Sequence, residues 1–204
     1  TGAMLFSGAA HAQPSWSDAA PLPSPRQEIY TTTHNGMIYT AGGLAEGASV
    51  VRNEFNVFDP QANRWLALAR LPAPRHHITL SALDGAIYAL GGFSGDFPNW
   101  KPESSVYVYD LETGKWNTLP DLPVARGEHV SAALDGKIYV IGGLLAWPGP
   151  AIDSNLMYDP DNPGLGWQVM APMPTARGGL GCAAWDAKIY CAGGMAQDSG
   201  NTAV

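Results

Sequence analysis

The sequence repeats one unit about every fifty residues, and this period constrains the fold more than any other feature. A Gly-Gly pair, a tryptophan and an arginine each recur four times, at intervals of 49, 51 and 51 residues. The copies are Gly42-Gly43, Gly91-Gly92, Gly142-Gly143 and Gly193-Gly194; Trp16, Trp65, Trp116 and Trp167; and Arg26, Arg75, Arg126 and Arg177. Such a period, with several short apolar segments per unit, is typical of propeller blades rather than solenoids.

Each unit contains a short hairpin whose sequence is clearest at residues 128–143. An apolar strand leads into Asp135-Gly136, a dipeptide that accepts the positive φ angles of a two-residue hairpin turn. The returning strand, residues 138–141, is apolar on both faces and ends at Gly-Gly. Strands buried on both sides have this composition, so we expect sheets that stack face to face.

The order of the landmarks resembles the kelch repeat: Gly-Gly, then Tyr-Asp as in Tyr109-Asp110, then tryptophan, then a Leu-Pro-x-x-Arg linker. The resemblance covers about residues 15–204. It implies four-stranded blades around a central channel, with the first strand of each blade lining the channel. The expected fold is therefore all-β, a kelch-type β-propeller forming a partial ring of about three and a half four-stranded blades.

The predicted blades run over about residues 27–68, 76–119, 128–169 and 179–204, the last incomplete. Residues 15–17, around Trp16, are predicted to be an orphan outer strand. We expect a fragment that forms an open arc; the alternative is a closed four-bladed ring whose last blade lacks its third strand. Residues 1–14 are interpreted as the remnant of a secretory signal, with Ala10-x-Ala12 as cleavage site, or as a disordered tail. The first interpretation predicts a periplasmic or secreted protein.

The composition excludes several function classes. A net charge of -7 argues against nucleic-acid binding, which needs a basic stripe. The sequence contains no run of about twenty apolar residues, so no membrane span is predicted. The sequence also lacks a P-loop, a His-Glu-x-x-His motif, a Gly-x-Ser-x-Gly motif and any clustered set of metal ligands. A copper-radical site of the galactose oxidase kind is rejected because no Tyr-His dipeptide occurs. We therefore predict no metal and no cofactor.

The two cysteines lie in the fourth hairpin, where Asp186-Ala187 replaces Asp-Gly. A two-residue turn there places Cys182 directly opposite Cys191, in a non-hydrogen-bonded pair whose Cα atoms lie about 4.5 Å apart. This distance suits a disulfide, which we predict for an exported chain. The alternative is two buried free thiols.

Candidate ligand residues follow from the same repeat. Each landmark arginine directly precedes a channel-lining strand, so Arg26, Arg75, Arg126 and Arg177 are expected to ring one mouth of the channel. The residues that follow them vary between blades, as a binding site on a constant frame does; they include His77 and His129, together with Glu28 and Glu128. The alternatives are that the arginines brace turns, and that the other residues are solvated loop residues.

Two further tryptophans, Trp100 and Trp147, lie outside the repeat pattern, in the loops after Gly-Gly. They are candidates for an aromatic platform that binds a sugar or a protein partner. Self-packing of a proline-rich loop is the alternative.

These residues favour an exported binding or interaction module that recognises a protein or a carbohydrate at the channel mouth. The kelch resemblance also implies an alternative, a sugar-directed enzyme such as a sialic acid mutarotase. In that case Glu28 beside Arg26, or Glu128 beside Arg126, would be the weak catalytic candidates. No catalytic residue is assigned, and enzymatic activity stays an open alternative for this chain.

Overall fold

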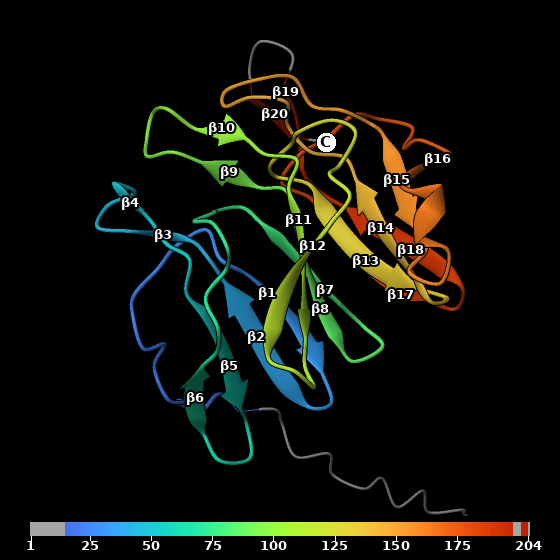
Figure 1. Cartoon of the computed structure of the whole chain (residues 1–204). Helices are drawn as coiled ribbons and strands as arrows, with labels where there is room; N and C mark the ends of the chain where they lie inside the picture. The colour runs from blue at the N-terminus through green and yellow to red at the C-terminus, as the bar shows by residue number, and fades with distance from the viewer. Residues whose placement is uncertain (1–14, 198–200, 204) are drawn as a thin grey trace, which may run out of the picture.

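The computed structural model describes residues 15–197 and 201–203, and its main feature is a series of antiparallel sheets around a channel (Figure 1). The first sheet contains β1 (Tyr30–His34), β2 (Met37–Ala41), β5 (Phe55–Asp59) and β6 (Arg64–Ala67). The second contains β7 (Thr79–Leu83), β8 (Ala86–Leu90), β11 (Val106–Asp110) and β12 (Lys115–Leu119). The third contains β13 (Val130–Leu134), β14 (Lys137–Ile141), β15 (Asn155–Tyr158) and β16 (Gln168–Met170). The expected all-β partial propeller is therefore confirmed.

The fourth sheet consists, within the described residues, of β17 (Gly181–Trp185) and β18 (Lys188–Ala192). Small two-stranded pairs follow three of the Gly-Gly turns: β3 (Leu44–Ala45) with β4 (Val50–Val51), β9 (Phe93–Ser94) with β10 (Lys101–Pro102), and β19 (Met195–Gln197) with β20 (Asn201–Ala203). A 3-10 turn, Pro163–Leu165, precedes β16. The pairing of β19 with β20 thus corresponds to the loop pairing that precedes a third strand in blades one and two.

The register of the hairpins agrees with the turn positions read from the sequence. In the third sheet Leu134 pairs with Lys137 across Asp135-Gly136. In the fourth, Trp185 pairs with Lys188, which places Cys182 opposite Cys191. Asp186 and Ala187 both have positive φ angles, 49° and 56°, so the turn keeps its two-residue form although it lacks glycine. The predicted cysteine register is therefore confirmed.

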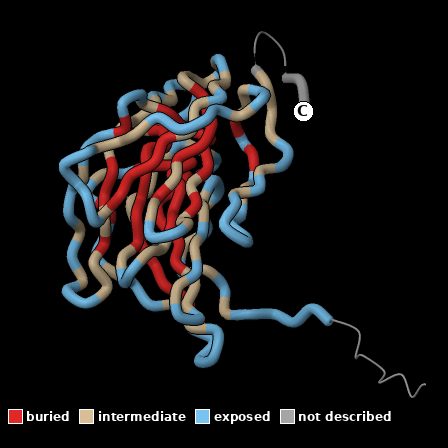
Figure 2. The backbone as a smooth tube through the Cα atoms, turned by 90° about the vertical axis from the view of Figure 1, so that its right-hand side faces the viewer, coloured by how far each residue is buried: buried red, intermediate tan, exposed pale blue. Residues whose placement is uncertain are grey.

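Burial comes from the stacking of one sheet on the next (Figure 2). Tyr39 of blade one packs with Ile87 and Ala89 of blade two, and Tyr88 of blade two packs with Val140 of blade three. Both tyrosines are 7% exposed. Tyr190 occupies the same position in blade four and is 52% exposed, since no further sheet of the described residues covers that face. Each blade thus owes its buried core to its neighbour.

The first strands of the four sheets line the channel, in the order β1, β7, β13 and β17. They line an open cavity of about 430 Å³ whose walls are mostly small residues, including Thr31, Ser81, Ser131 and Ala183. The hydroxyl group of Ser81 donates a hydrogen bond to that of Ser131, 2.8 Å away. At the outer side, Trp65 lies in β6, Trp116 in β12, and Trp167 directly before β16. Their indole N–H groups bind carbonyl oxygens of the preceding linkers, at Ala20, Ala69 and Pro120.

Residues 15–17, predicted as an orphan outer strand, pair with no strand of the described residues, and the side chain of Trp16 is fully exposed. The physical reason is that an outer strand needs a third strand to bond with. In the described part of the fourth sheet, β18 is the outermost strand. The interpretation of residues 1–14 falls outside the described residues.

Candidate functional site

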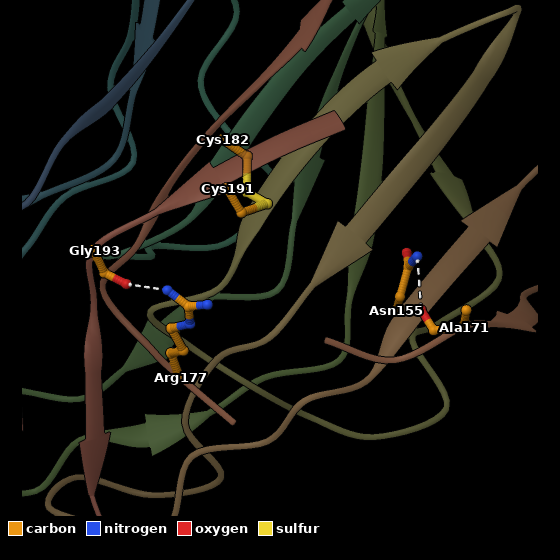
Figure 3. The surroundings of a disulfide bond; sticks show 6 residues. All are labelled: Asn155, Ala171, Arg177, Cys182, Cys191 and Gly193. Atoms are coloured by element: carbon orange, nitrogen blue, oxygen red, sulfur yellow. Dashed lines mark hydrogen bonds between the residues drawn. A yellow bond between two sulfur atoms is a disulfide. The ribbon is translucent and has the colours of Figure 1, made fainter. Parts of the chain in front are cut away.

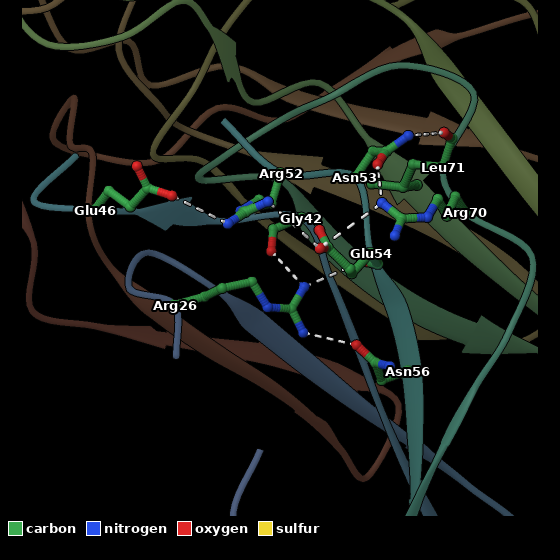
Figure 4. A network of polar contacts seen from close by, with 9 residues as sticks. All are labelled: Arg26, Gly42, Glu46, Arg52, Asn53, Glu54, Asn56, Arg70 and Leu71. Carbon is green, nitrogen blue, oxygen red and sulfur yellow. Dashed lines mark hydrogen bonds and ion pairs between the residues drawn. The ribbon is translucent and has the colours of Figure 1, made fainter. Parts of the chain in front are cut away.

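The landmark arginines brace the turns of their own blades. Arg26 donates to the carbonyl oxygens of Gly42 and Glu54, at 2.8 and 3.2 Å, and to the side-chain oxygen of Asn56, at 2.7 Å (Figure 4). Arg126 donates to the Gly142 carbonyl at 3.2 Å and to Ser154 at 2.6 Å. Arg177 donates to the Gly193 carbonyl (Figure 3).

Arg75 follows a variant of this pattern, binding the Ser105 hydroxyl at 3.0 Å and Glu103 at 3.4 Å. These contacts favour the bracing alternative for all four arginines. The guanidinium groups were expected to surround the channel mouth. They point instead toward oxygen atoms of the polypeptide beside them. Burial lowers the pKa of Arg126 to about 10, because the buried guanidinium charge is no longer solvated by water.

The residue two positions after each arginine adopts left-handed backbone conformation. Glu28, His77 and Glu128 have φ angles of 53°, 51° and 55°, and Gly179 has 65°. Left-handed φ angles are uncommon for residues other than glycine. The backbone N–H of His77 binds the carbonyl oxygen of Glu28, and that of Gly179 binds the carbonyl oxygen of Glu128. This recurring backbone turn therefore links blade one to blade two and blade three to blade four. It also brings the side chains of Glu28, His77 and Glu128 to the channel mouth.

His77 is the centre of the polar contacts at this mouth. Its Nε2 atom lies 2.9 Å from Oε2 of Glu28 in blade one and 3.1 Å from Oε1 of Glu128 in blade three. Its Nδ1 atom lies 2.6 Å from Nδ1 of His76. Only 3% of the His77 side chain is exposed, whereas Glu28 is 43% exposed. We call Glu28, His76, His77 and Glu128 the mouth cluster; it gathers groups from three blades.

Burial and nearby charges shape the electrostatics of the mouth cluster. His76 is fully buried, and burial together with the adjacent His77 lowers its pKa to about 4, so it is neutral at pH 7. Tyr30 of β1 places its hydroxyl group 3.5 Å from Oε2 of Glu128. Burial first, and then the charges of Glu128 and Glu28, raise the pKa of this phenol well above its usual range. Tyr30 is therefore a neutral donor toward the carboxylate.

Aromatic rings cover the two histidines. The ring centroid of Trp100 lies 4.8 Å from that of His76 and 5.0 Å from that of His77. Trp147, from the blade-three loop, packs on Trp100 at 5.0 Å. Phe93 lies within 6 Å of both imidazoles, and Phe97 reaches Trp100 while staying largely exposed. The two tryptophans thus form one aromatic wall at the mouth, built from loops of two blades.

His129, a predicted ligand residue, lies in the core instead. It is fully buried, and its Nε2 atom lies 3.0 Å from the Thr79 hydroxyl of blade two. Burial, and to a lesser degree Arg126, lower its pKa to about 3. The equivalent positions in the other blades are Ile29, Ile78 and Leu180, so the repeat itself marks this as an apolar position. The structure therefore brings together Glu28, His77, Glu128, Trp100 and Trp147, and separates His129 from them.

Two contributors were not singled out from the sequence: Tyr30 and Phe93. The expected pairing of each glutamate with the nearby arginine is not seen among the described residues, whose ion pairs join both glutamates to His77 instead. Within the described part of the chain, no group of three or more His, Cys, Asp or Glu residues has metal-binding geometry. Residues 15–197 and 201–203 also contain no apolar helix of membrane-spanning length.

Comparison with known proteins gives two family-model matches. Residues 9–143 match the KLHDC2/KLHL20/DRC7 Kelch-repeats domain, and residues 125–174 match the Kelch motif. The first match covers more than half of the chain.

Curated relatives and a solved structure agree with these matches. Kelch-like protein terF of Aspergillus terreus is 27% identical over 93% of this chain and 43% of its own length. The F-box/kelch-repeat protein At1g67480 of Arabidopsis thaliana is 33% identical over 45% of this chain and 23% of its own length. The solved structure of YjhT superposes with a TM-score of 0.75 at 18% identity, over 90% of this chain and 64% of that one. The chain thus spans less than half the length of these two curated relatives.

Proposed function

Because the chain belongs to the Kelch-repeat family, we propose that it is a binding module that recognises a protein or a carbohydrate at the channel mouth. The supporting observation is the convergence of Glu28, His77 and Glu128, from three blades, beside the aromatic wall of Trp100 and Trp147. Tryptophan is one of the residues that most often dominate binding energy at interfaces, and the carboxylates beside it can accept hydrogen bonds. Kelch propellers generally serve as protein-interaction modules, so a protein ligand agrees with the family.

The partly exposed groups are the ones a ligand reaches. Glu28 offers an accessible carboxylate, and Phe97 offers an accessible ring. The arginines are turned toward backbone carbonyls, as described above, so a ligand meets acceptors and aromatic faces rather than guanidinium groups. This arrangement favours ligands that donate hydrogen bonds and present an apolar face, such as a sugar ring or a peptide side chain.

The test is binding by the purified chain to a glycan array and a peptide array, followed by calorimetry on the hits. Trp147→Ala and Glu28→Gln should each weaken binding about tenfold, in line with the loss of a central interface residue. Asp135→Asn is the matched control, since Asp135 lies in the β13–β14 turn at the opposite end of the strands. A ligand bound equally well by all four proteins would place binding elsewhere.

A second candidate is a sugar-directed enzyme such as a sialic acid mutarotase. The observation in its favour is the contact of two carboxylates with an imidazole, groups that transfer protons. Anomer exchange of sialic acid, followed by NMR, tests it: turnover that is lost in Glu28→Gln or Glu128→Gln supports the enzyme.

We also propose that the protein is exported, because the disulfide of Cys182 and Cys191 suits an oxidising compartment.

A further inference from the structure

The mouth cluster forms a continuous chain of hydrogen-bonding groups across three blades. Glu28 comes from blade one, His76 and His77 from blade two, and Glu128 from blade three. Each contact in the chain requires one partner to hold a hydrogen atom and the other to accept it. The geometry therefore determines how many protons the cluster must carry.

The hydrogen atom of His76 can be placed first. Its Nε2 atom lies 3.1 Å from the carbonyl oxygen of Gly95, and a carbonyl oxygen can only accept. Nε2 of His76 therefore carries the hydrogen. Because this buried imidazole is neutral at pH 7, its Nδ1 atom carries none and acts as an acceptor.

The placement of hydrogen on the His76 ring then determines which nitrogen atoms of His77 carry hydrogen. Nδ1 of His77 lies 2.6 Å from the bare Nδ1 of His76, so His77 must donate there. A neutral His77 would have no hydrogen left for Nε2. Its lone pair would then face two carboxylate oxygens, at 2.9 and 3.1 Å, which is repulsive. The contacts can be satisfied only if one more proton is present.

We propose that His77 carries hydrogen on both ring nitrogens and that its Nε2–H clamps Glu28 and Glu128 together, joining three blades through one proton. Imidazole is a stronger base than a carboxylate, so the additional proton resides on the ring. The cluster then has two carboxylates, one imidazolium and one neutral imidazole, a net charge of -1 instead of -2.

The surrounding groups offer no other counter-charge. Tyr30, on β1, is a neutral phenol that approaches Glu128. Arg75, just before His76, pairs with Glu103. Phe93, Trp100 and Trp147 cover the remaining side without charge. Among the ion pairs of the described residues, Glu28 and Glu128 each pair with His77 and with neither lysine nor arginine. The clamp therefore depends on the His77 proton.

The direction of the pH effect follows. Where the folded cluster holds a proton that the unfolded chain would release, stability falls as the pH rises. The clamp is thus closed on the acid side of its proton release and opens on the alkaline side, where two carboxylates face a bare nitrogen. This makes the mouth a pH-sensitive device, and histidine is the side chain suited to that role near neutrality.

The experiment is NMR of the ring nitrogens in the full chain labelled with ¹⁵N-histidine, recorded from about pH 5 to about pH 9. His77→Asn identifies the His77 signals. We expect both His77 nitrogens to be protonated at neutral pH, and His76 to be neutral with hydrogen on Nε2. In the Glu28→Gln/Glu128→Gln double variant, which removes both carboxylate acceptors, His77 should lose the hydrogen on one of its ring nitrogens. Asp135→Asn should match the wild type.

Urea unfolding across the same pH range tests the clamp itself and needs no ligand, so it is independent of the proposed function. The wild type should exceed the double variant in stability at neutral pH, and this difference should shrink as the pH rises. A folded wild type whose His77 Nε2 carries no hydrogen at any pH studied would overturn the proposal. So would a His77 titration that is identical in the wild type and the double variant.

Discussion

The guanidinium group of Arg126 lies 3.2 Å from the carbonyl oxygen of Gly142, the first glycine after β14, and is 1% exposed. It also binds Ser154 in the segment that leads into β15, and the carbonyl oxygen of Val124. One side chain thus fixes the turn after the second strand to the start of the third. Arg177 makes a single such contact, to Gly193, and is less buried.

Arg126→Met should therefore cost far more stability than Arg177→Met. Removing the Arg126 side chain leaves Ser154 and the Gly142 carbonyl without their buried partner, at a cost of about 2–4 kcal/mol. The partly buried equivalent, Arg177, makes one such contact and should cost less than about 1 kcal/mol. Urea unfolding of the two variants measures the difference. Equal losses would show that the braces do not depend on burial.

The disulfide is expected to stabilise the fourth hairpin. Cys182 and Cys191 face each other with Cα atoms 4.2 Å apart and are joined through their sulfur atoms (Figure 3). Closing a loop of about ten residues in the unfolded chain is worth about 2–3 kcal/mol. Reductant should therefore lower the free energy of unfolding of the wild type by about that amount.

A matched control comes from the repeat itself, because blade three has Ser131 opposite Val140 at the same positions. The Cys182→Ser/Cys191→Val double variant reproduces that pair and should be insensitive to reductant. Alkylation before and after reduction counts the thiols. Two reactive thiols in the untreated wild type would contradict the disulfide.

The sequence was most informative wherever one blade repeats another. The period predicted the sheets. Counting residues outward from the two-residue turn Asp186-Ala187 predicted that Cys182 faces Cys191, because the turn position determines which side chains of a hairpin pair. The same comparison shows why His129 was misplaced as a ligand residue. Its equivalents Ile29, Ile78 and Leu180 are apolar. This indicates a core position in every blade, even though blade three has a histidine there.

The mouth cluster lay beyond sequence reasoning for a different reason. Glu28 and Glu128 are 100 residues apart in the chain, and their distance to His77 depends on how three blades are rotated around the channel. All three residues have a left-handed backbone, which directs their side chains toward one another, and none of them is glycine; the equivalent residue of blade four is Gly179. Short-range sequence patterns do not determine the distances between side chains of different blades, which depend on how the blades pack together.

Close packing beneath the aromatic wall makes Gly127 sensitive to substitution. A Cβ atom at Gly127 would overlap the ring of Phe93, which packs against His76, His77 and Trp100. Gly127→Ala should cost about 1–3 kcal/mol through this overpacking, and should change tryptophan fluorescence as Phe93 shifts. Gly164→Ala is the control, because a Cβ atom there meets nothing within 4 Å. If the two variants behave alike, Phe93 has room to move without disturbing the wall.

The buried His129 should make the protein less stable in acid. Burial lowers its folded pKa to about 3, whereas a histidine in the unfolded chain has a pKa near 6.5. Between these values the unfolded state binds the additional proton. The stability contribution is therefore fully present above about pH 6.5 and is lost progressively as the pH falls. His76, with a folded pKa of about 4, acts in the same direction.

His129→Leu, which introduces the residue found at Leu180, should flatten this dependence. The slope of unfolding free energy against pH should decrease by about 1 kcal/mol per pH unit between about pH 6 and pH 4. Thr79→Val is the matched control, since it also removes the contact between Thr79 and His129 but keeps the titrating ring. Urea unfolding at several pH values measures both slopes. A His129→Leu slope that equals the Thr79→Val slope would mean that His129 takes up its proton while the protein is still folded.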